Sequence, residues 1–276
     1  DKEQFSLGAN GQLSFINDPD FEVPIDVGGD NNYNITIQAT AGQNVTSLDV
    51  TISVKDAFEG RVVDGPISKA TVFIDSNSDS IKNSSEVGVT TNSQGFFYIP
   101  KDSIVCNGIC DHTVVSQGGS DTQTGQNLNI TFSSPLVGNQ LFSVSPLSTL
   151  IVASTDDGAL LSLLGIESTV SEVIARDLWQ LAKDNNVSAK KLMRINYQLG
   201  MIFGATQSLF LLTDDLNASQ ISSKAAEKLV ALINSTDKAI LTKSSLNSYF
   251  TNMINELDSD SLFSANAISS LAENLS

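Results

Sequence analysis

Oxygen-bearing side chains recur at alternate positions in one short stretch of the chain, residues 75–86. The donors at its first, third, fifth, seventh, ninth and twelfth positions are Asp75, Asn77, Asp79, the Ile81 carbonyl, Asn83 and Glu86. A calcium ion takes about six to eight oxygen ligands, and a short loop surrounds it when alternate residues point inward. These residue types at this spacing match a calcium-binding loop. We therefore expect calcium as a structural cofactor at this loop.

The sixth position of this loop departs from the usual pattern, in which glycine allows a sharp turn. The residue there is Ser80, so we expect a left-handed or strained backbone at that position. Residues 70–74 and 87–91 on either side have the composition of strands. Calcium would therefore hold a β-hairpin closed. The alternative interpretation is a solvated turn, because Asn, Ser and Asp favour turns with or without a metal.

Composition and charge exclude several classes of partner. The formal net charge of the 276-residue chain is −16. Nucleic acids and anionic membrane surfaces would repel such a chain, and its apolar runs are far too short to cross a bilayer. We expect no nucleic-acid partner and no membrane insertion. The composition favours an extracellular location, on the cell surface or secreted, where calcium screens carboxylates.

The two cysteines lie close together, at Cys106 and Cys110, with Gly108 between them. This spacing around a turn favours a small disulfide ring, which fits an oxidising compartment. A zinc or redox site that adds His112, the single histidine, is the alternative. No fourth soft ligand stands nearby, so the disulfide is the preferred interpretation.

The hydrophobic periodicity changes twice along the chain. Residues 1–56 alternate with period two, and residues 57–145 set short strands between turns rich in Gly, Asp and Pro. From residue 146 the period is helical: Thr169 and Glu172 form a capping box that opens a helix to about residue 183, and Ser188 caps a longer helix. Gly200 and Gly204 on that helix would allow close contact of a neighbouring helix. We expect two β units followed by an all-α helical bundle.

The first β unit resembles the second half of a cadherin-like repeat. The residues that carry the resemblance are Asp-Pro-Asp-Phe-Glu-Val-Pro at 18–24, Asn-Tyr at 32–33, Ile-Thr-Ile-Gln-Ala at 35–39 and the strand that ends at Asp56. In that family such carboxylates bind calcium between repeats, which implies a weak metal site at Glu22 and Asp56. A third ligand of the family falls at Ala41. The missing half of the repeat would come from a longer chain or, by strand addition, from a neighbouring subunit.

The second unit resembles the calcium-binding B-type domains of serine-aspartate repeat surface proteins and related prealbumin-like β-sandwich modules. The resemblance covers about forty residues: Gly-Arg-Val-Val-Asp-Gly-Pro-Ile at 60–67, Ala-Thr-Val-Phe-Ile-Asp at 70–75, the calcium loop, and Thr-Thr-Asn-Ser-Gln-Gly-Phe-Phe at 90–97. It implies a calcium-stabilised β-sandwich over 57–145. The passage into the helical residues 146–276 resembles a junction in very large bacterial surface proteins.

Catalytic patterns are absent from the sequence. A triad would have His112 as its single candidate base, and no GxSxG, HExxH or phosphate-binding loop occurs. Asp18, Asp20 and Glu22 could act as the acid and base of a glycosidase if their separation suited it. Trp179 is the one tryptophan that could stack on a sugar, and core packing in a helix explains it better. We expect no enzyme.

These observations predict an extracellular, calcium-stabilised structural or adhesive segment of a cell-surface protein. Its partners would be neighbouring domains or subunits of a surface assembly. Two alternatives stay open. One is a self-assembling filament or surface-layer subunit, a homopolymer completed by strand exchange. The other is a secreted glycan-binding or hydrolytic module.

Overall fold

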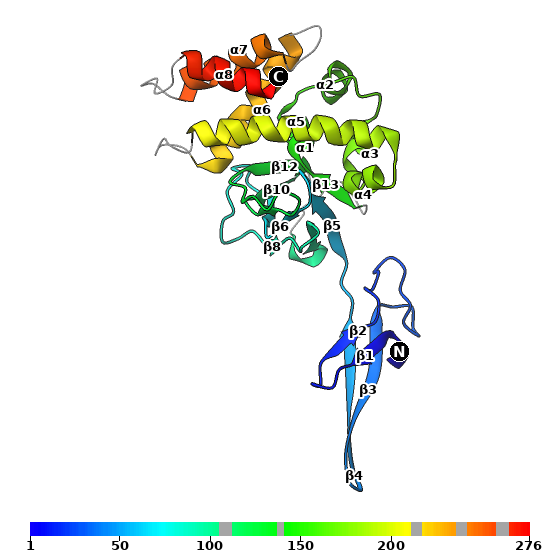
Figure 1. Cartoon of the computed structure of the whole chain (residues 1–276). Coiled ribbons are helices and arrows are strands. Elements are labelled where there is room, and N and C mark those ends of the chain that lie inside the picture. Colours follow the sequence, from blue (N-terminus) through cyan, green and yellow to red (C-terminus); the bar gives the residue numbers. More distant parts are fainter. Residues whose placement is uncertain (105–111, 137–140, 211–216, 236–241, 258–264) are drawn as a thin grey trace. The chain divides into compact units, whose positions relative to one another are not determined.

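The fold is mixed β and α and is seen in a computed structural model (Figure 1). The structure describes residues 1–104, 112–136, 141–210, 217–235, 242–257 and 265–276. The chain divides into two compact units. The first comprises Asp1–Ala57 with Pro100–Ile104, and the second comprises Phe58–Ile99 with Val105–Ser276.

The first unit is built on antiparallel pairs, as the period-two pattern predicts. A short 3-10 helix, η1 (Lys2–Gln4), precedes β1 (Phe5–Leu7), which pairs with β2 (Leu13–Phe15). β3 (Asn32–Ala41) pairs along its whole length with β4 (Asn44–Ser53) to form a two-stranded ribbon. We call this pair the β3–β4 ribbon.

The two faces of the β3–β4 ribbon differ. At the base of one face, Tyr33 is fully buried under Phe5 and Phe15, whose ring centroids lie 6.0 and 5.2 Å from its own. The opposite face is polar, and its cross-strand pairs are joined by side-chain hydrogen bonds such as that from Thr36 Oγ1 to Asp49 Oδ1 at 2.7 Å. Such pairs stabilise a ribbon that has little core of its own.

The second unit contains a four-stranded antiparallel sheet and a three-stranded sheet. The order of the first is β12-β10-β7-β8, and the order of the second is β13-β5-β9, with β13 parallel to β5. A short pair joins β6 to β11. The strands are β5 (Ala57–Val62), β6 (Ile67–Ser68), β7 (Thr71–Asp75), β8 (Gly88–Thr90), β9 (Phe96–Pro100), β10 (Thr113–Gln117), β11 (Ser120–Asp121), β12 (Thr131–Pro135) and β13 (Phe142–Val144). The 3-10 helix η2 (Lys101–Ser103) follows β9 and belongs to the first unit.

Helices follow the strands from residue 146 onward, as the periodicity predicts. They are α1 (Pro146–Ala153), α2 (Asp157–Leu163), α3 (Val170–Ile174), α4 (Leu178–Lys183), α5 (Val187–Phe210), α6 (Ala218–Ser235), α7 (Lys243–Leu257) and α8 (Ala265–Leu275). None of them, over the residues described, is long and apolar enough to cross a membrane.

Two helix boundaries differ from the sequence prediction. The capping box of Thr169 and Glu172 is present, but the helix it opens ends at Ile174 and a new one starts after Asp177. Asp177 causes the restart, because its carboxylate caps α4 through the Gln180 N–H and also pairs with Arg61 at 2.8 Å. The cap of α5 is Asn186, whose Oδ1 accepts the Ala189 N–H, and not Ser188.

The helices and the four-stranded sheet share a core. Phe132 of β12 meets Phe203 of α5 edge to face at 6.2 Å between centroids. Asn196, fully buried on α5, donates to Val63 O at 2.9 Å and accepts the Leu147 N–H at 3.0 Å. The Leu147 N–H is one of the N-terminal donors of α1 that have no partner inside the helix. The expected division after residue 145 therefore lies inside this compact unit.

Candidate functional site

The 75–86 loop connects the two strands of a hairpin. β7 and β8 pair antiparallel, with Thr71 opposite Thr90 and Phe73 opposite Gly88. Ser80 has a φ of 54° and Ser78 a φ of 61°, both left-handed. The hairpin and the left-handed sixth position are the two local features that the sequence predicted, and both are confirmed.

The carboxylates at the two ends of the loop are buried and hydrogen-bonded. Asp75 is 3% exposed, and it accepts the N–H groups of Ser80 at 2.8 Å and Asp79 at 3.3 Å. Glu86 is 6% exposed and reaches back to the residue after Asp75, accepting the Ser76 N–H at 2.9 Å. Its second oxygen accepts the Asn83 N–H at 3.1 Å. Both carboxylates thus hold the loop in shape through its backbone.

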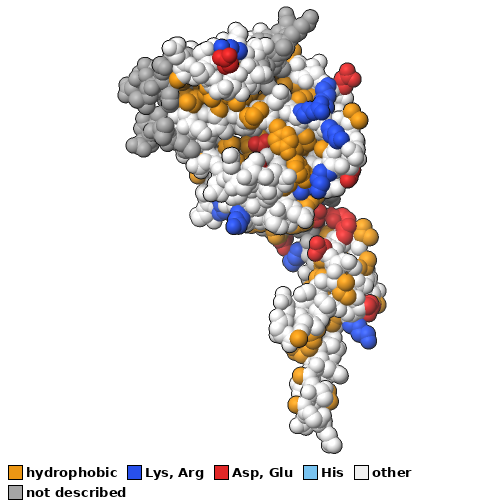
Figure 2. Space-filling view, viewed as in Figure 1, with side chains coloured by type: hydrophobic (Ala, Val, Ile, Leu, Met, Phe, Trp, Pro, Cys, Tyr) orange, Lys and Arg blue, Asp and Glu red, His pale blue; other side chains and the backbone are white. Residues whose placement is uncertain are grey.

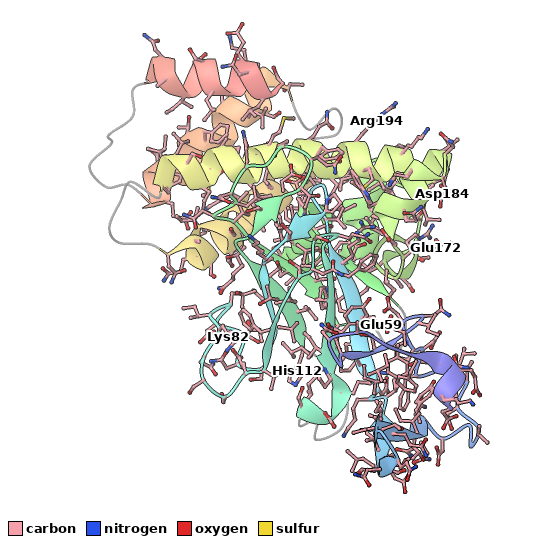
Figure 3. The ribbon with its side chains drawn as sticks, turned by 60° about the horizontal axis from the view of Figure 1, so that its bottom comes forward. Glu59, Lys82, His112, Glu172, Asp184 and Arg194 are labelled. Carbon is pink, nitrogen blue, oxygen red and sulfur yellow. The ribbon has the colours of Figure 1, made fainter. Side chains whose placement is uncertain are left out.

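The remaining predicted ligands lie at the exposed end of the loop. Asp79 accepts the N–H of Ile81 and the amide of Asn77, each at 2.8 Å. Asn83 Oδ1 accepts both the N–H and the hydroxyl of Ser85. The methylene chain of Lys82, the basic residue of the loop, lies against Gly88 (Figure 3).

The donor set of the loop fits a hard cation. All six predicted donors are oxygens, and an ionised carboxylate has about four acceptor sites, of which Asp75 uses two here. Over the described residues, however, no three His, Cys, Asp or Glu side chains are grouped so that they could hold a metal ion. A bound calcium ion would therefore require Asp79 to turn inward toward Asp75 and Glu86.

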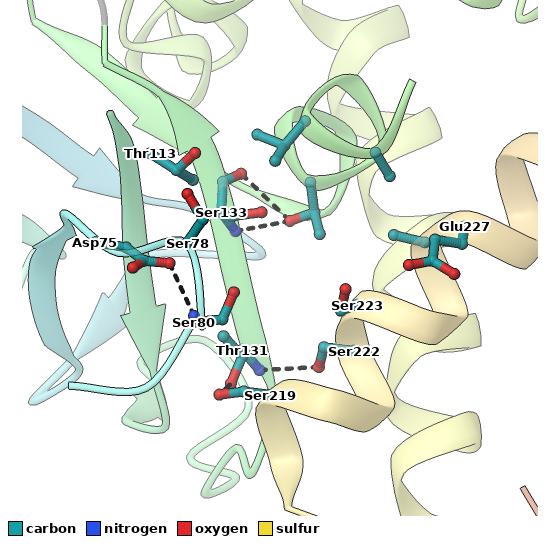
Figure 4. Close-up of a pocket in the computed structure, with 14 residues that line it drawn as sticks. Asp75, Ser78, Ser80, Thr113, Thr131, Ser133, Ser219, Ser222, Ser223 and Glu227 are labelled. Carbon is teal, nitrogen blue, oxygen red and sulfur yellow. Dashed lines mark hydrogen bonds between the residues drawn. The ribbon is translucent and has the colours of Figure 1, made fainter. Parts of the chain in front are cut away.

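The loop is connected to the helices through Gln117, a contact that sequence reasoning missed. The Gln117 amide donates to Ser80 O at 3.0 Å and to the Ser219 hydroxyl of α6 at 2.9 Å. A cavity of about 330 Å³ lies beside this contact, between the loop, the sheet and the helices α1 and α6 (Figure 4). Its lining is rich in hydroxyl groups, including those of Thr131 and Ser222. No local pattern reveals this contact, because β10 and α6 are far apart in sequence.

The second predicted metal pair contacts a lysine. Lys101 Nζ lies 2.7 Å from Asp56 Oδ1 and 4.0 Å from Glu22 Oε1, all within the first unit. The structure does bring Glu22 and Asp56 to one place, but around an ammonium group. The ammonium group of Lys101 supplies positive charge at the position where the resemblance implies a metal.

The other candidate residues form no constellation. Asp18 is exposed, and Asp20 accepts the N–H groups of Glu22 and Val23, which makes it part of a turn. Trp179 is half-buried on α4. The predicted disulfide between Cys106 and Cys110 lies outside the described residues.

Comparison with known proteins identifies no relative of this chain. The chain matches no protein-family model, no curated protein and no solved structure.

Proposed function

We propose that the chain is a calcium-stabilised structural or adhesive segment of an extracellular surface protein. The β strands of residues 57–145 would form a prealbumin-like β-sandwich and the later helices a bundle, with residues 1–56 as part of a cadherin-like unit. The observation that carries the proposal is the 75–86 loop. It closes a hairpin, supplies oxygen donors alone and places a left-handed residue at its sixth position.

Calcium would act here through stiffness. The Ser80 carbonyl accepts from Gln117, which also holds Ser219 of α6. A calcium ion that neutralises the loop carboxylates would hold Ser80 in one position. It would thereby stabilise the contact between the sheet and α6. A segment that transmits force on a cell surface benefits from such a contact, because a sheet and a helix that are tied together resist separation.

The test is thermal unfolding with calcium and with a chelator. A ligand present at about 100 times its Kd stabilises the folded state by about 2.7 kcal/mol, which corresponds to about 5–10 °C in Tm for a unit of this size. The exposed pair of changes Asn77→Ala and Asp79→Ala removes two ligands and leaves the buried carboxylates in place. This double variant should lose the calcium response.

The matched control is Ser84→Ala, a change in the same loop at a position with no predicted ligand. Its calcium response should equal that of the parent. Equal Tm values for the parent in calcium and in chelator would refute the calcium part of the proposal. The double variant of Asp75→Ala and Glu86→Ala serves as a second check, although loss of these buried acceptors also lowers stability directly.

A second candidate function is a filament or surface-layer subunit completed by strand exchange. The β3–β4 ribbon favours it, because each strand has one partner strand in the part of the chain that the structure describes. Apolar side chains reach the surface of the ribbon (Figure 2), including Leu48, 63% exposed on the face that also carries Tyr33. Open edges beside apolar side chains are templates for another strand.

Sedimentation velocity over a range of concentrations tests this candidate. Strand exchange predicts assemblies that grow with concentration and disappear in Leu48→Lys. Val45→Lys is the matched control, since Val45 is similarly exposed, at 57%, on the opposite face of the ribbon. A parent chain that stays monomeric throughout would exclude strand exchange.

A further inference from the structure

A second cavity of the larger unit, about 560 Å³ in volume, lies along one face of α5. Its volume falls in the range of pockets that bind small molecules. Side chains from the turn after β5, from β11 and the residues that follow it, and from α5 line it. We call it the α5 cavity.

One end of the α5 cavity is acidic. Asp64 and Asp121 both line it, and Asp121 Oδ1 lies against Gly65, the residue after Asp64. The Asp64 carboxylate rests on Gly200 so closely that a side chain at position 200 would overlap it. Within the described chain, Asp64 Oδ1 is buried without a hydrogen-bond donor, and neither aspartate forms an ion pair.

A positive charge at this end would favour the ionised form of Asp64, which burial disfavours. Burial, and then the neighbouring charge of Asp121, raise the pKa of Asp64 to about 8. Burial and these same two carboxylates also raise the pKa of Tyr197 to about 12. The phenol of Tyr197 therefore stays neutral, and its ring offers a surface that ammonium groups favour.

The other end of the α5 cavity carries an unpaired amide. Gln207 is 2% exposed, and neither its Oε1 nor its Nε2 has a hydrogen-bond partner among the described residues. Leaving such groups unpaired is costly, so this side chain points to an absent partner. Gln207 lies seven residues beyond Gly200 on α5, which corresponds to about 10 Å along a helix axis.

The lining of the α5 cavity is more apolar than polar. Leu128, Ile130, Met201, Gly204 and Leu275 contribute to it. A side chain at position 204 would stand at ordinary contact distance from Ile130. A ligand that fits has a cationic head, an aliphatic body and a polar group about 10 Å from the head.

We propose that the α5 cavity binds a primary aliphatic ammonium group at Asp64 and Asp121, with the ligand's polar far end hydrogen-bonded to Gln207. The ligand is either a free amine or a lysine side chain of a partner, whose backbone amide supplies the far end. A calcium ion would fill neither the apolar middle nor the site at Gln207. The two aspartates alone would also give it few of its oxygen ligands.

Calorimetric titration of the whole chain with four probes tests the proposal. Hexylamine carries the head and body, aminocaproamide adds the far amide, acetyl-lysine methylamide presents a lysine, and hexanol lacks the charge. We expect aminocaproamide to bind more tightly than hexylamine and hexanol not to bind. The lysine probe distinguishes the two sources: it should bind at least as tightly as aminocaproamide if a partner's lysine is the ligand.

Two variants locate the binding. At pH 9, above the raised pKa of Asp64 and with the amines still protonated, Asp64→Asn should weaken every amine by about 30-fold or more, because it removes the buried charge. Gln207→Leu should weaken aminocaproamide by about threefold to tenfold and leave hexylamine unchanged. The control is Asp184→Asn, an exposed aspartate outside the cavity, which should bind as the parent does.

Four results would overturn the proposal, three of them in the amine titrations. Hexanol could bind as tightly as hexylamine, the amines could bind equally well to the parent and to Asp64→Asn, or no amine could bind. Calcium that displaces the amine from the parent but does not bind to Asp64→Asn would also overturn it, in favour of a metal site.

Discussion

The 75–86 loop and the α5 cavity both bury carboxylates at turns beside strands of the same unit, but they treat them differently. In the loop, Asp75 and Glu86 accept backbone N–H groups from four residues of the loop itself. In the cavity, Asp64 Oδ1 accepts no hydrogen bond from the described residues.

Hydrogen-bond donors, more than burial, determine whether the charged form of a buried carboxylate is stabilised. A carboxylate that accepts several N–H groups keeps its charge at little cost, whereas one without donors favours the neutral form. The backbone of the loop supplies donors to its own carboxylates, and a cation would add to a formed structure. The α5 cavity holds an uncompensated group, which a ligand can stabilise more strongly.

The largest effect that this contrast predicts is a difference between the parent and Asp64→Asn in how stability depends on pH. The pKa of Asp64 is raised to about 8 in the folded chain. Between about pH 4 and pH 8 the folded state then binds a proton that the unfolded state has lost, so the free energy of unfolding falls as pH rises. We expect this group to remove about 5 kcal/mol over that interval, and Asn to abolish the loss.

Urea unfolding at a series of pH values measures this effect. The parent should lose stability toward pH 8, and Asp64→Asn should be the more stable protein there. Asp184→Asn, at an exposed position outside the cavity lining, should follow the parent. A parent and an Asp64→Asn variant with parallel pH profiles would contradict the uncompensated state of Asp64.

The next test compares two buried amides on α5. Asn196 satisfies Val63 O and the Leu147 N–H, whereas Gln207 has no partner among the described residues. Asn196→Ala should cost about 2 kcal/mol because both partners lose their bond, and Gln207→Leu should add about 1 kcal/mol. Denaturant unfolding without amine gives both values, and destabilisation by Gln207→Leu would show that its amide is satisfied.

The sequence predicted the loop because all of its features are local. Its donors alternate within twelve residues, its flanks have strand composition, and the sixth position must turn sharply whichever residue stands there. The change from strand to helical periodicity near residue 146 was local too. Patterns of this kind follow from the geometry of one element, so they can be read without the tertiary structure.

The α5 cavity could not be predicted, because its parts meet only through the tertiary fold. In the sequence, Asp64 lies between two short strands and Gln207 on a long helix, far apart in the chain. The spacing of Gly200 from Gly204 predicts close contact with a neighbouring helix. The structure places the Asp64 carboxylate against Gly200 instead. Small residues indicate close approach, and the sequence does not say what approaches.

The smallest expected effect belongs to Ser80→Gly in the loop. A left-handed φ of 54° costs a serine about 1 kcal/mol, and glycine avoids that cost but loses part of the gain through a more flexible unfolded chain. We expect a net stabilisation of about 0.5 kcal/mol in chelator. Ser84→Gly is the control, since its φ is not positive, and it should be destabilised instead. If both glycines destabilise the chain equally, Ser80 is not strained, and the loop would owe its shape to the Asp75 and Glu86 hydrogen bonds alone.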